Sequence, residues 1–191
     1  MRGNTDASSR RSGVTSERVA LLVLSVLLAA AVTALGVTHK TCPRCEDGWE
    51  PHGGKCYFFS SVTSSWTQSR KQCTSMRGDL VVINNREQQK FLQSRLMIKM
   101  DNPEDKFWIG LTDSKNEDEW LWVDNSRLDP RLKFWRHYEP DNGKVPNPDG
   151  EVYPDGEDCV RMGEEYLQSW SDNSCESYHK SICEKPEEAC G

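Results

Sequence analysis

The sequence predicts an α+β domain that follows one N-terminal membrane-spanning helix. Three observations lead to this prediction. The run from Val19 to Val37 contains 19 residues and no charge. All eight cysteines follow that run, at positions 42, 45, 56, 73, 159, 175, 183 and 190. Beyond residue 55, two segments with the apolar spacing of helices are followed by several short segments with the composition of strands.

The uncharged run is long enough to cross a bilayer. At about 1.5 Å per residue, a helix of this length extends roughly 28 Å, close to the thickness of the hydrocarbon core. A cleaved signal peptide is the alternative, because the small residues Ala34 and Gly36 stand where a peptidase cuts. Signal-peptide cores usually run only about 7 to 15 residues, so the sequence favours an uncleaved signal-anchor.

Basic residues around this run predict its orientation. Four arginines precede it, at positions 2, 10, 11 and 18, whereas only His39, Lys40 and Arg44 follow closely. This bias places the N-terminus in the cytoplasm. We therefore expect a single-pass type II protein of the plasma membrane with its domain outside the cell. Its expected parts are a cytoplasmic tail (1–18), the signal-anchor helix (19–37), a short stalk (38–41) and the domain (42–191).

The charge distribution narrows the choice of partners. The formal net charge is -6, but the first 37 residues carry four arginines against Asp6 and Glu17. That part has a net charge of +2, which leaves -8 for the remainder. An acidic outer part argues against nucleic acid or heparin-like polyanions as partners.

The cysteines indicate the compartment. An even number confined to one side of a membrane points to oxidising surroundings and a disulfide framework. Eight cysteines allow about 105 pairings, so the sequence alone does not choose among them. The spacing of Cys42 and Cys45 also fits a redox or zinc motif, but no second metal-binding pair accompanies it.

Two helices are expected in the first half of the domain, after a strand over 55–60. Ser64 or Ser65 caps the first helix, which runs to about Arg77 and stops at Gly78. Its inward residues are expected to be Trp66, Cys73 and Met76. After a short buried strand over 80–83, Asn84 or Asn85 caps the second helix. Its apolar face is expected to be Phe91, Leu92, Leu96 and Met97.

Strands dominate the second half. They are expected at 107–112, 120–124, 159–163 and 178–184. Between the second and third of these lies a run of some 35 residues that is dense in Pro, Gly, Asp and Asn. A structureless stretch of this length in a compact domain is usually functional. The sequence therefore predicts that the binding site includes this loop.

The stretch from Glu139 to Cys175 concentrates oxygen ligands. It contains three clusters, which are Glu139-Pro140-Asp141, Glu157-Asp158-Cys159 and Trp170-Ser171-Asp172-Asn173-Ser174-Cys175. Together they contain five carboxylates and two cysteines that could staple the loop. Hard oxygen ligands at this density suit Ca²⁺, which takes about six to eight of them. The sequence predicts a calcium-dependent binding site.

The domain resembles the C-type lectin-like domain over essentially all of the stretch from Cys42 to Cys190. The resemblance rests on motifs in the family's order, which are Gly48-Trp49, Gly54-Lys55-Cys56-Tyr57, Trp108-Ile109-Gly110-Leu111, Trp120-Leu121-Trp122 and the closing Cys159, Cys175 and Cys183. It implies an α+β fold in which two helices flank two small antiparallel sheets with a long calcium and ligand loop. The type II dendritic-cell mannose-binding receptors are the group that it resembles.

The resemblance also implies how the cysteines pair. The family's bridges become Cys45–Cys56, Cys73–Cys183 and Cys159–Cys175. The outer pair, Cys42 and Cys190, resembles the extra bridge of the type II mannose-binding receptors. In the alternative, Cys42 forms an interchain disulfide in the stalk and makes a homo-oligomer. Cys190 would then have no cysteine to pair with.

Carried over residue by residue, the family's two calcium sites fall on nine positions. The principal site, which also contacts the ligand, becomes Glu139, Asp141, Glu157, Ser171 and Asp172. The auxiliary site becomes Asp113, Glu117, Asn142 and Asp158. The resemblance further implies a cis bond between Glu139 and Pro140, which proline makes affordable. Solvated acidic loops are the ordinary alternative for both sets.

Two departures from the family pattern concern the sugar. Asn has both a donor and an acceptor, whereas an ionised Asp only accepts. Asp141 and Ser171 stand where the family has amides, so both amide donors to a sugar are missing. The loop from Asp141 to Glu157 is also longer than in typical mannose-binding members. Glu139 is the mannose-type choice and Asp141 the galactose-type one, and we lean to mannose- or fucose-type glycans.

The function implied by the resemblance is a receptor for a glycan or glycoprotein in immune recognition or adhesion, with Ca²⁺ as its cofactor. The alternative is the natural-killer-receptor style of this fold, which binds a protein ligand without calcium. Members of that class generally lose the carboxylates, and this chain keeps most of them. An enzyme is not predicted, because no nucleophile elbow, HExxH or P-loop motif is present.

Overall fold

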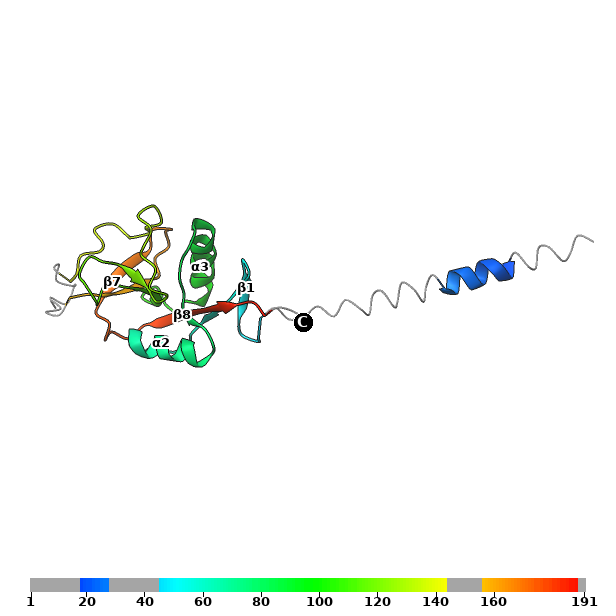
Figure 1. The fold of residues 1–191 in the computed structure, drawn as a ribbon, viewed down its shortest axis with the longest axis horizontal. Helices are drawn as coiled ribbons and strands as arrows, with labels where there is room; N and C mark the ends of the chain where they lie inside the picture. Colours follow the sequence, from blue (N-terminus) through cyan, green and yellow to red (C-terminus); the bar gives the residue numbers. More distant parts are fainter. Residues whose placement is uncertain (1–17, 28–44, 144–155, 189–191) are drawn as a thin grey trace, which may run out of the picture. The chain divides into compact units, whose positions relative to one another are not determined.

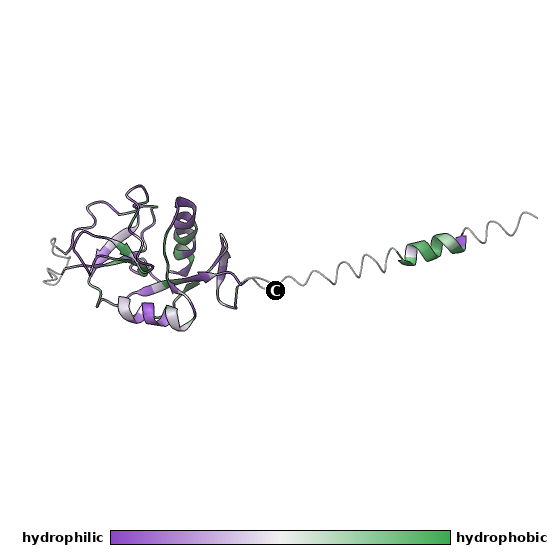
Figure 2. Ribbon diagram, in the orientation of Figure 1, coloured by the Kyte–Doolittle hydropathy of each residue, from purple (hydrophilic) through white to green (hydrophobic). Residues whose placement is uncertain are grey.

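The structure is a computed structural model that describes residues 18–27, 45–143 and 156–188 (Figure 1). Contacts within the chain divide it into two units, Met1–Pro43 and Arg44–Gly191. In the first unit, residues 18–27 are helical and are hydrophobic over most of their length (Figure 2). No helix within the described ranges combines the length and apolar character that crossing a membrane requires. Positions 28–37 of the predicted anchor and the predicted stalk lie outside the described residues.

The second unit is built on one mixed sheet with the strand order β1-β2-β8-β4-β6-β7, in which β3 pairs with β8 and β5 with β4. The strands are β1 (Glu50–His52), β2 (Lys55–Phe59), β3 (Asp79–Leu80), β4 (Phe107–Thr112), β5 (Leu121–Trp122), β6 (Cys159–Met162), β7 (Trp170–Asn173) and β8 (Lys180–Pro186). The expectation of two separate antiparallel sheets is wrong in one respect. β4 and β8 pair in parallel, at Phe107↔Lys180 and Trp108↔Ser181, and this pair joins the antiparallel strands on either side.

The first helix of this unit, α2 (Trp66–Ser75), begins at the predicted cap. The Ser65 side chain accepts a backbone N–H of the first turn. At the other end the predicted stop is shifted by one residue, because Arg77 rather than Gly78 takes the left-handed conformation, with φ 63°. Gly78 is required for a different reason. A Cβ atom there would collide with the backbone carbonyl of Glu184 in β8.

The second helix, α3 (Arg86–Lys99), is capped by Asn85, whose side chain accepts a backbone N–H at 2.8 Å. Leu92 and Leu96 are fully buried, as predicted. Met97 is 42% exposed, so its assignment to the core face is wrong. The buried face of α3 includes Gln89 instead of Met97. The Oε1 of Gln89 accepts a hydrogen bond from the indole N–H of Trp170 at 3.0 Å.

The two helices lie on opposite sides of β8. Figure 1 shows β8 passing between α2 and α3, with β1 on one side and β7 on the other. Two buried tryptophans bind the layers together through their indole N–H groups. That of Trp66 donates to the carbonyl of Ile109 in β4, and that of Trp108 donates to the carbonyl of Ser64, each at 2.9 Å.

Three disulfides reinforce this arrangement, with the pairings that the resemblance implied. They are Cys45–Cys56, Cys73–Cys183 and Cys159–Cys175. The second joins α2 to β8 over a sequence separation of 110, and the third joins β6 to the segment after β7. The proposed outer pair, Cys42 and Cys190, lies outside the described residues.

The long loop between β5 and β6 is held against β7 by backbone hydrogen bonds. The N–H of Trp170 donates to the carbonyl of Phe134, and the N–H of Arg136 donates to the carbonyl of Trp170, each at 2.9 Å. The loop contributes no named helix or strand in its described parts, 123–143 and 156–158. Its attachment to β7 places the segment from Arg136 onward beside Asp172.

Candidate functional site

Three of the predicted ligands form one acidic cluster. Glu139 and Asp141 from the long loop and Asp172 from β7 each offer a carboxylate oxygen, and these oxygens lie within 4.8 Å of one another. Asp172 also holds the loop in place, because its two oxygens accept the backbone N–H groups of Asp141 at 3.3 Å and Asn142 at 2.7 Å. The peptide bond between Glu139 and Pro140 is cis, as the resemblance implied.

The carboxylate of Glu139 is largely shielded from solvent, with a side chain that is 6% exposed. Its Oε1 contacts Arg136, at 2.8 Å from Nε and 2.6 Å from Nη2. Its Oε2 is buried and receives no hydrogen bond. Burial, together with the neighbouring carboxyl of Asp172, raises the pKa of Glu139 to about 8. A cation bound beside Glu139 would give Oε2 the partner that the protein does not supply.

Glu157 faces the same cluster from the end of the long loop, two residues before β6. Its Oε1 accepts the side-chain amide of Asn173 at 3.0 Å. Burial raises the pKa of Glu157 to about 7, and the charges of Asp172 and Asp141 add to this effect. Four carboxylates therefore share one electrostatic environment, in which a divalent cation would relieve their repulsion.

Ser171 has a different neighbour from the one its predicted role requires. It is buried in β7, and its hydroxyl accepts the Nε–H of Arg161 at 3.2 Å. Arg161 is its cross-strand partner in β6. The family's ligand pattern, carried over to this sequence, did not predict this contact between Ser171 and the guanidinium of Arg161.

The auxiliary cluster is also brought together. Oxygens of Asp113, Glu117 and Asp158 lie within 4.8 Å of one another. Asp113 is 5% exposed; its Oδ2 accepts the backbone N–H of Asp118 at 3.0 Å, while its Oδ1 is buried and receives no hydrogen bond. Burial raises the pKa of Asp113 to about 7, with further contributions from the charges of Glu117 and Asp158.

Asn142 joins the two clusters. Its Nδ2 donates to Glu117 at 2.8 Å, and its Oδ1 accepts the backbone N–H of Glu157, also at 2.8 Å. Asn142 has φ 54°, a left-handed conformation that Asn tolerates. A Cβ atom at Gly156 would collide with the Asn142 side chain, so this approach of the two ends of the loop requires glycine.

The donor sets of both clusters fit calcium. They consist of carboxylate oxygens with one amide, and no thiolate or imidazole takes part. Ca²⁺ prefers such ligands. The buried oxygens Glu139 Oε2 and Asp113 Oδ1, which receive no hydrogen bond, give each cluster a position for an ion.

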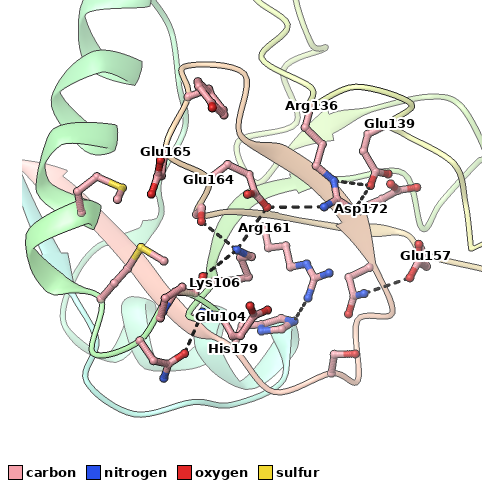
Figure 3. Close-up of a pocket in the computed structure, with 18 of the residues that line it drawn as sticks. Glu104, Lys106, Arg136, Glu139, Glu157, Arg161, Glu164, Glu165, Asp172 and His179 are labelled. Carbon is pink, nitrogen blue, oxygen red and sulfur yellow. Dashed lines mark hydrogen bonds and ion pairs between the residues drawn. The ribbon is translucent and has the colours of Figure 1, made fainter. Parts of the chain in front are cut away.

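A pocket of about 1060 Å³ extends from the Glu139 cluster across β6 (Figure 3). Its basic lining residues are Lys106, Arg136, Arg161 and His179. Figure 3 shows Arg136 directed toward Glu139 and Glu164, and Arg161 toward His179. None of these basic residues was predicted. Arg136 lies three residues before Glu139, which is a weak signal, whereas nothing in the sequence connects Arg161 with residue 179.

Sequence comparison places the chain among known lectins. The family model for the lectin C-type domain matches residues 62–185. Mouse C-type lectin domain family 4 member E is 35% identical over 150 residues, which cover 78% of this chain and 62% of that protein. Human asialoglycoprotein receptor 2 is 34% identical over 154 residues, which cover 81% and 44%. The chain spans less than two thirds of the length of either curated relative.

Solved structures give the same result. The carbohydrate-recognition domain of the mouse scavenger receptor C-type lectin matches with a TM-score of 0.63 and 33% identity, over 77% of this chain and all of that chain. The corresponding domain of cow CD23, solved in the presence of a GlcNAc2Man3 oligosaccharide, matches with a TM-score of 0.62 and 32% identity, over 78% and 100%. The family consists of carbohydrate-binding receptors rather than enzymes. These similarities and the match over residues 62–185 show that this chain belongs to the C-type lectin domain family.

Proposed function

We propose that the chain is a cell-surface receptor that binds glycans through a calcium ion. The ion would be held by the principal set, Glu139, Asp141, Glu157, Ser171 and Asp172. The observation that carries this proposal is the buried Oε2 of Glu139, which lies among carboxylates and receives no hydrogen bond. A second ion would be held by Asp113, Glu117, Asn142 and Asp158, where Asp113 Oδ1 has the same character.

The bound ion supplies coordination positions for neighbouring hydroxyls of a sugar. The chain's own residues do the remaining work. The carboxylates of Glu139 and Glu157 would accept hydrogen bonds from those hydroxyls, since ionised carboxylates act only as acceptors. Asp172 keeps the loop seated, because it already accepts two backbone N–H groups from it.

Mannose- or fucose-type glycans are the proposed sugar class. Glu139 is the mannose-type residue of the tripeptide. Two similar domains support this class, since cow CD23 was solved with a mannose-containing oligosaccharide and murine dendritic cell inhibitory receptor 2, at 27% identity, with an N-glycan.

We further propose a type II orientation in the plasma membrane, with residues 19–37 as the anchor and 42–191 outside the cell. The helical, largely apolar residues 18–27 and the arginines before them support this. A homo-oligomer is also proposed, since the similar Kupffer cell receptor Clec4f, at 28% identity, has a trimeric structure. Protease protection of an N-terminal tag in intact cells tests the orientation.

The central experiment measures glycan binding by the full chain on transfected cells, with and without calcium. Mannose-, fucose- and galactose-substituted polymers serve as probes. We expect binding in about 2 mM Ca²⁺ that a chelator abolishes, because this concentration exceeds the dissociation constants of about 0.1 to 1 mM of extracellular calcium modules. Glu139→Gln should lose this binding, whereas Asp129→Asn, an exposed acidic residue paired with Arg131, should keep it.

A second candidate function is calcium-independent binding of a protein ligand. One observation favours it, because Arg136 already supplies Glu139 with a cationic partner inside the chain. The same cells distinguish the two functions. Absence of glycan binding, together with no calcium uptake by the purified full chain, would leave protein recognition as the function of this surface.

A further inference from the structure

Asn173, the last residue of β7, has a buried amide oxygen without a partner. The residue is 6% exposed, and its Oδ1 receives no hydrogen bond. A buried acceptor in this state destabilises a folded protein unless a bound group completes it. Asn173 also lines the same pocket as Glu139, Glu157 and Asp172. The residue with this unpartnered oxygen therefore lies in the wall of the candidate ion site.

Glu157 holds the amide of Asn173 in one orientation. The Nδ2 of Asn173 donates to Oε1 of Glu157 at 3.0 Å, in a contact that is buried. Because an ionised carboxylate only accepts, the amide presents its nitrogen to Glu157 and leaves Oδ1 for another group. The charges of Asp141 and Asp172 act on Glu157 as well, so this place favours a cation over a neutral donor.

Ser171 and Asn173 share one face of β7 but have different cross-strand partners, since alternate residues of a strand point the same way. Ser171 is opposite Arg161, which donates its Nε–H to the serine hydroxyl at 3.2 Å. A cation at Ser171 would meet that positive charge. Asn173 is opposite Cys159, which forms a neutral disulfide with Cys175. The oxygen at position 173 is therefore better suited to a cation than the oxygen at position 171.

We propose that Asn173 is a ligand of the ion in the principal site, where its Oδ1 does what the family pattern assigns to an amide at position 171. The inference rests on the proposed function and replaces Ser171 as the neutral ligand of that site. Four carboxylates and one amide oxygen, all of kinds that Ca²⁺ prefers, then form the ligand set, which is Glu139, Asp141, Glu157, Asp172 and Asn173.

The test separates the oxygen of Asn173 from its N–H donor. Asn173→Ala removes both, whereas Asn173→Asp keeps an oxygen ligand and loses only the donor to Glu157. Calorimetry measures the calcium affinity of the purified full chain, and the rise in its unfolding temperature on adding Ca²⁺ is a second readout. Asn173→Ala should bind calcium at least about tenfold more weakly and show a smaller rise. Asn173→Asp should stay within about threefold of wild type or bind more tightly.

Asn84→Ala is the matched control, because it makes the same change at an exposed asparagine that does not line this pocket. Wild-type calcium affinity in Asn173→Ala would overturn the inference. A loss in Asn173→Asp as large as that in Asn173→Ala would also overturn it, because Asn173 would then act only by positioning Glu157. If Asn173→Ala does not fold in chelator, Asn173→Asp decides alone, and a loss of about tenfold or more counts against the inference. These results leave the proposed function standing, whereas a wild type that binds no calcium removes both.

Discussion

Arg136 neutralises one oxygen of Glu139 and leaves the other without a partner. The guanidinium lies 2.6 Å from Oε1, whereas Oε2 of the same carboxylate is buried and receives no hydrogen bond. The two oxygens of one side chain therefore play separate parts. Oε1 is held by the protein, and Oε2 is available to an ion. Each part has a measurable consequence.

Glu139→Gln should separate ion binding from folding. The amide keeps the size of the side chain but removes its charge, so calcium affinity should fall at least about tenfold. In chelator, the unfolding temperature should not fall, because the substitution also removes the repulsion with Asp172. Calorimetry with Ca²⁺ and thermal unfolding in chelator check the two parts, with Asp129→Asn as the control. Undiminished calcium affinity would contradict the assignment of Oε2.

Calcium affinity should fall when the pH is lowered from 7.5 to 5. The pKa values of Asp113, Glu139 and Glu157 lie at about 7, 8 and 7 in the metal-free domain. Protons therefore compete with the ion across this range. Titrations at the two pH values measure the effect, and equal dissociation constants would show that these carboxylates do not hold the ion.

The stability of the metal-free domain should change in the opposite direction. The pKa values of Glu139, Asp113 and Glu157 are raised above those of the unfolded chain, so the folded state holds protons that the unfolded state has lost. The free energy of unfolding in chelator should then decrease as the pH rises from 6.5 to 8. Below about pH 6.5 the depressed pKa of His179 acts the other way, which is why the measurement starts there. Denaturant titrations should show a smaller slope for Glu139→Gln, and a stability that rises with pH in wild type would refute this account.

Asp141→Asn should strengthen binding to mannose polymers. The substitution returns an N–H donor to a position where an ionised carboxylate only accepts. A gain of about tenfold corresponds to one hydrogen bond of ordinary strength. Glycan arrays with both forms, in calcium and in chelator, measure it. If the two forms give equal signals, the missing donor is not what limits sugar binding.

The two disulfides of the core should differ in their contribution to stability. Cys73–Cys183 closes a loop with a separation of 110, whereas Cys159–Cys175 closes one of 16. The chain-entropy model assigns about 4 to 5 kcal/mol to the first and about 3 kcal/mol to the second. Replacing each pair by alanines and measuring denaturant midpoints tests the order. A larger loss from the shorter loop would mean that contacts near the site, rather than loop entropy, decide the difference.

Local signals predicted the helices and most strands well. Ser65 and Asn85 cap their helices because their side chains satisfy backbone N–H groups within a few residues, which sequence shows directly. The strand β7 was not predicted, since Ser171, Asp172 and Asn173 are poor strand formers. They are buried there because they meet Arg161, the loop backbone and Glu157.

Long-range relationships were not visible in the sequence. The carboxylates were predicted because they occur in short clusters with recognisable neighbours. The Arg161–His179 contact joins a residue of β6 to one that lies 18 positions later, just before β8, and arginine and histidine occur on many surfaces. The parallel pairing of β4 with β8 was missed for the same reason, because about half of the domain separates Trp108 from Ser181 along the chain.

The strand order has a mechanical consequence. β1 and β7 lie at opposite ends of the order, with the hydrogen-bonded ladders of β2, β8, β4 and β6 between them. A pull on Asp172 against a chain held at Glu50 is nevertheless carried by covalent bonds, because residues 174–179 lead directly from β7 to β8 and the Cys73–Cys183 disulfide ties β8 to α2. The short β4–β8 ladder, with its two paired positions Phe107↔Lys180 and Trp108↔Ser181, is thereby spared this load, and the disulfide limits how far β7 can be drawn away from β1.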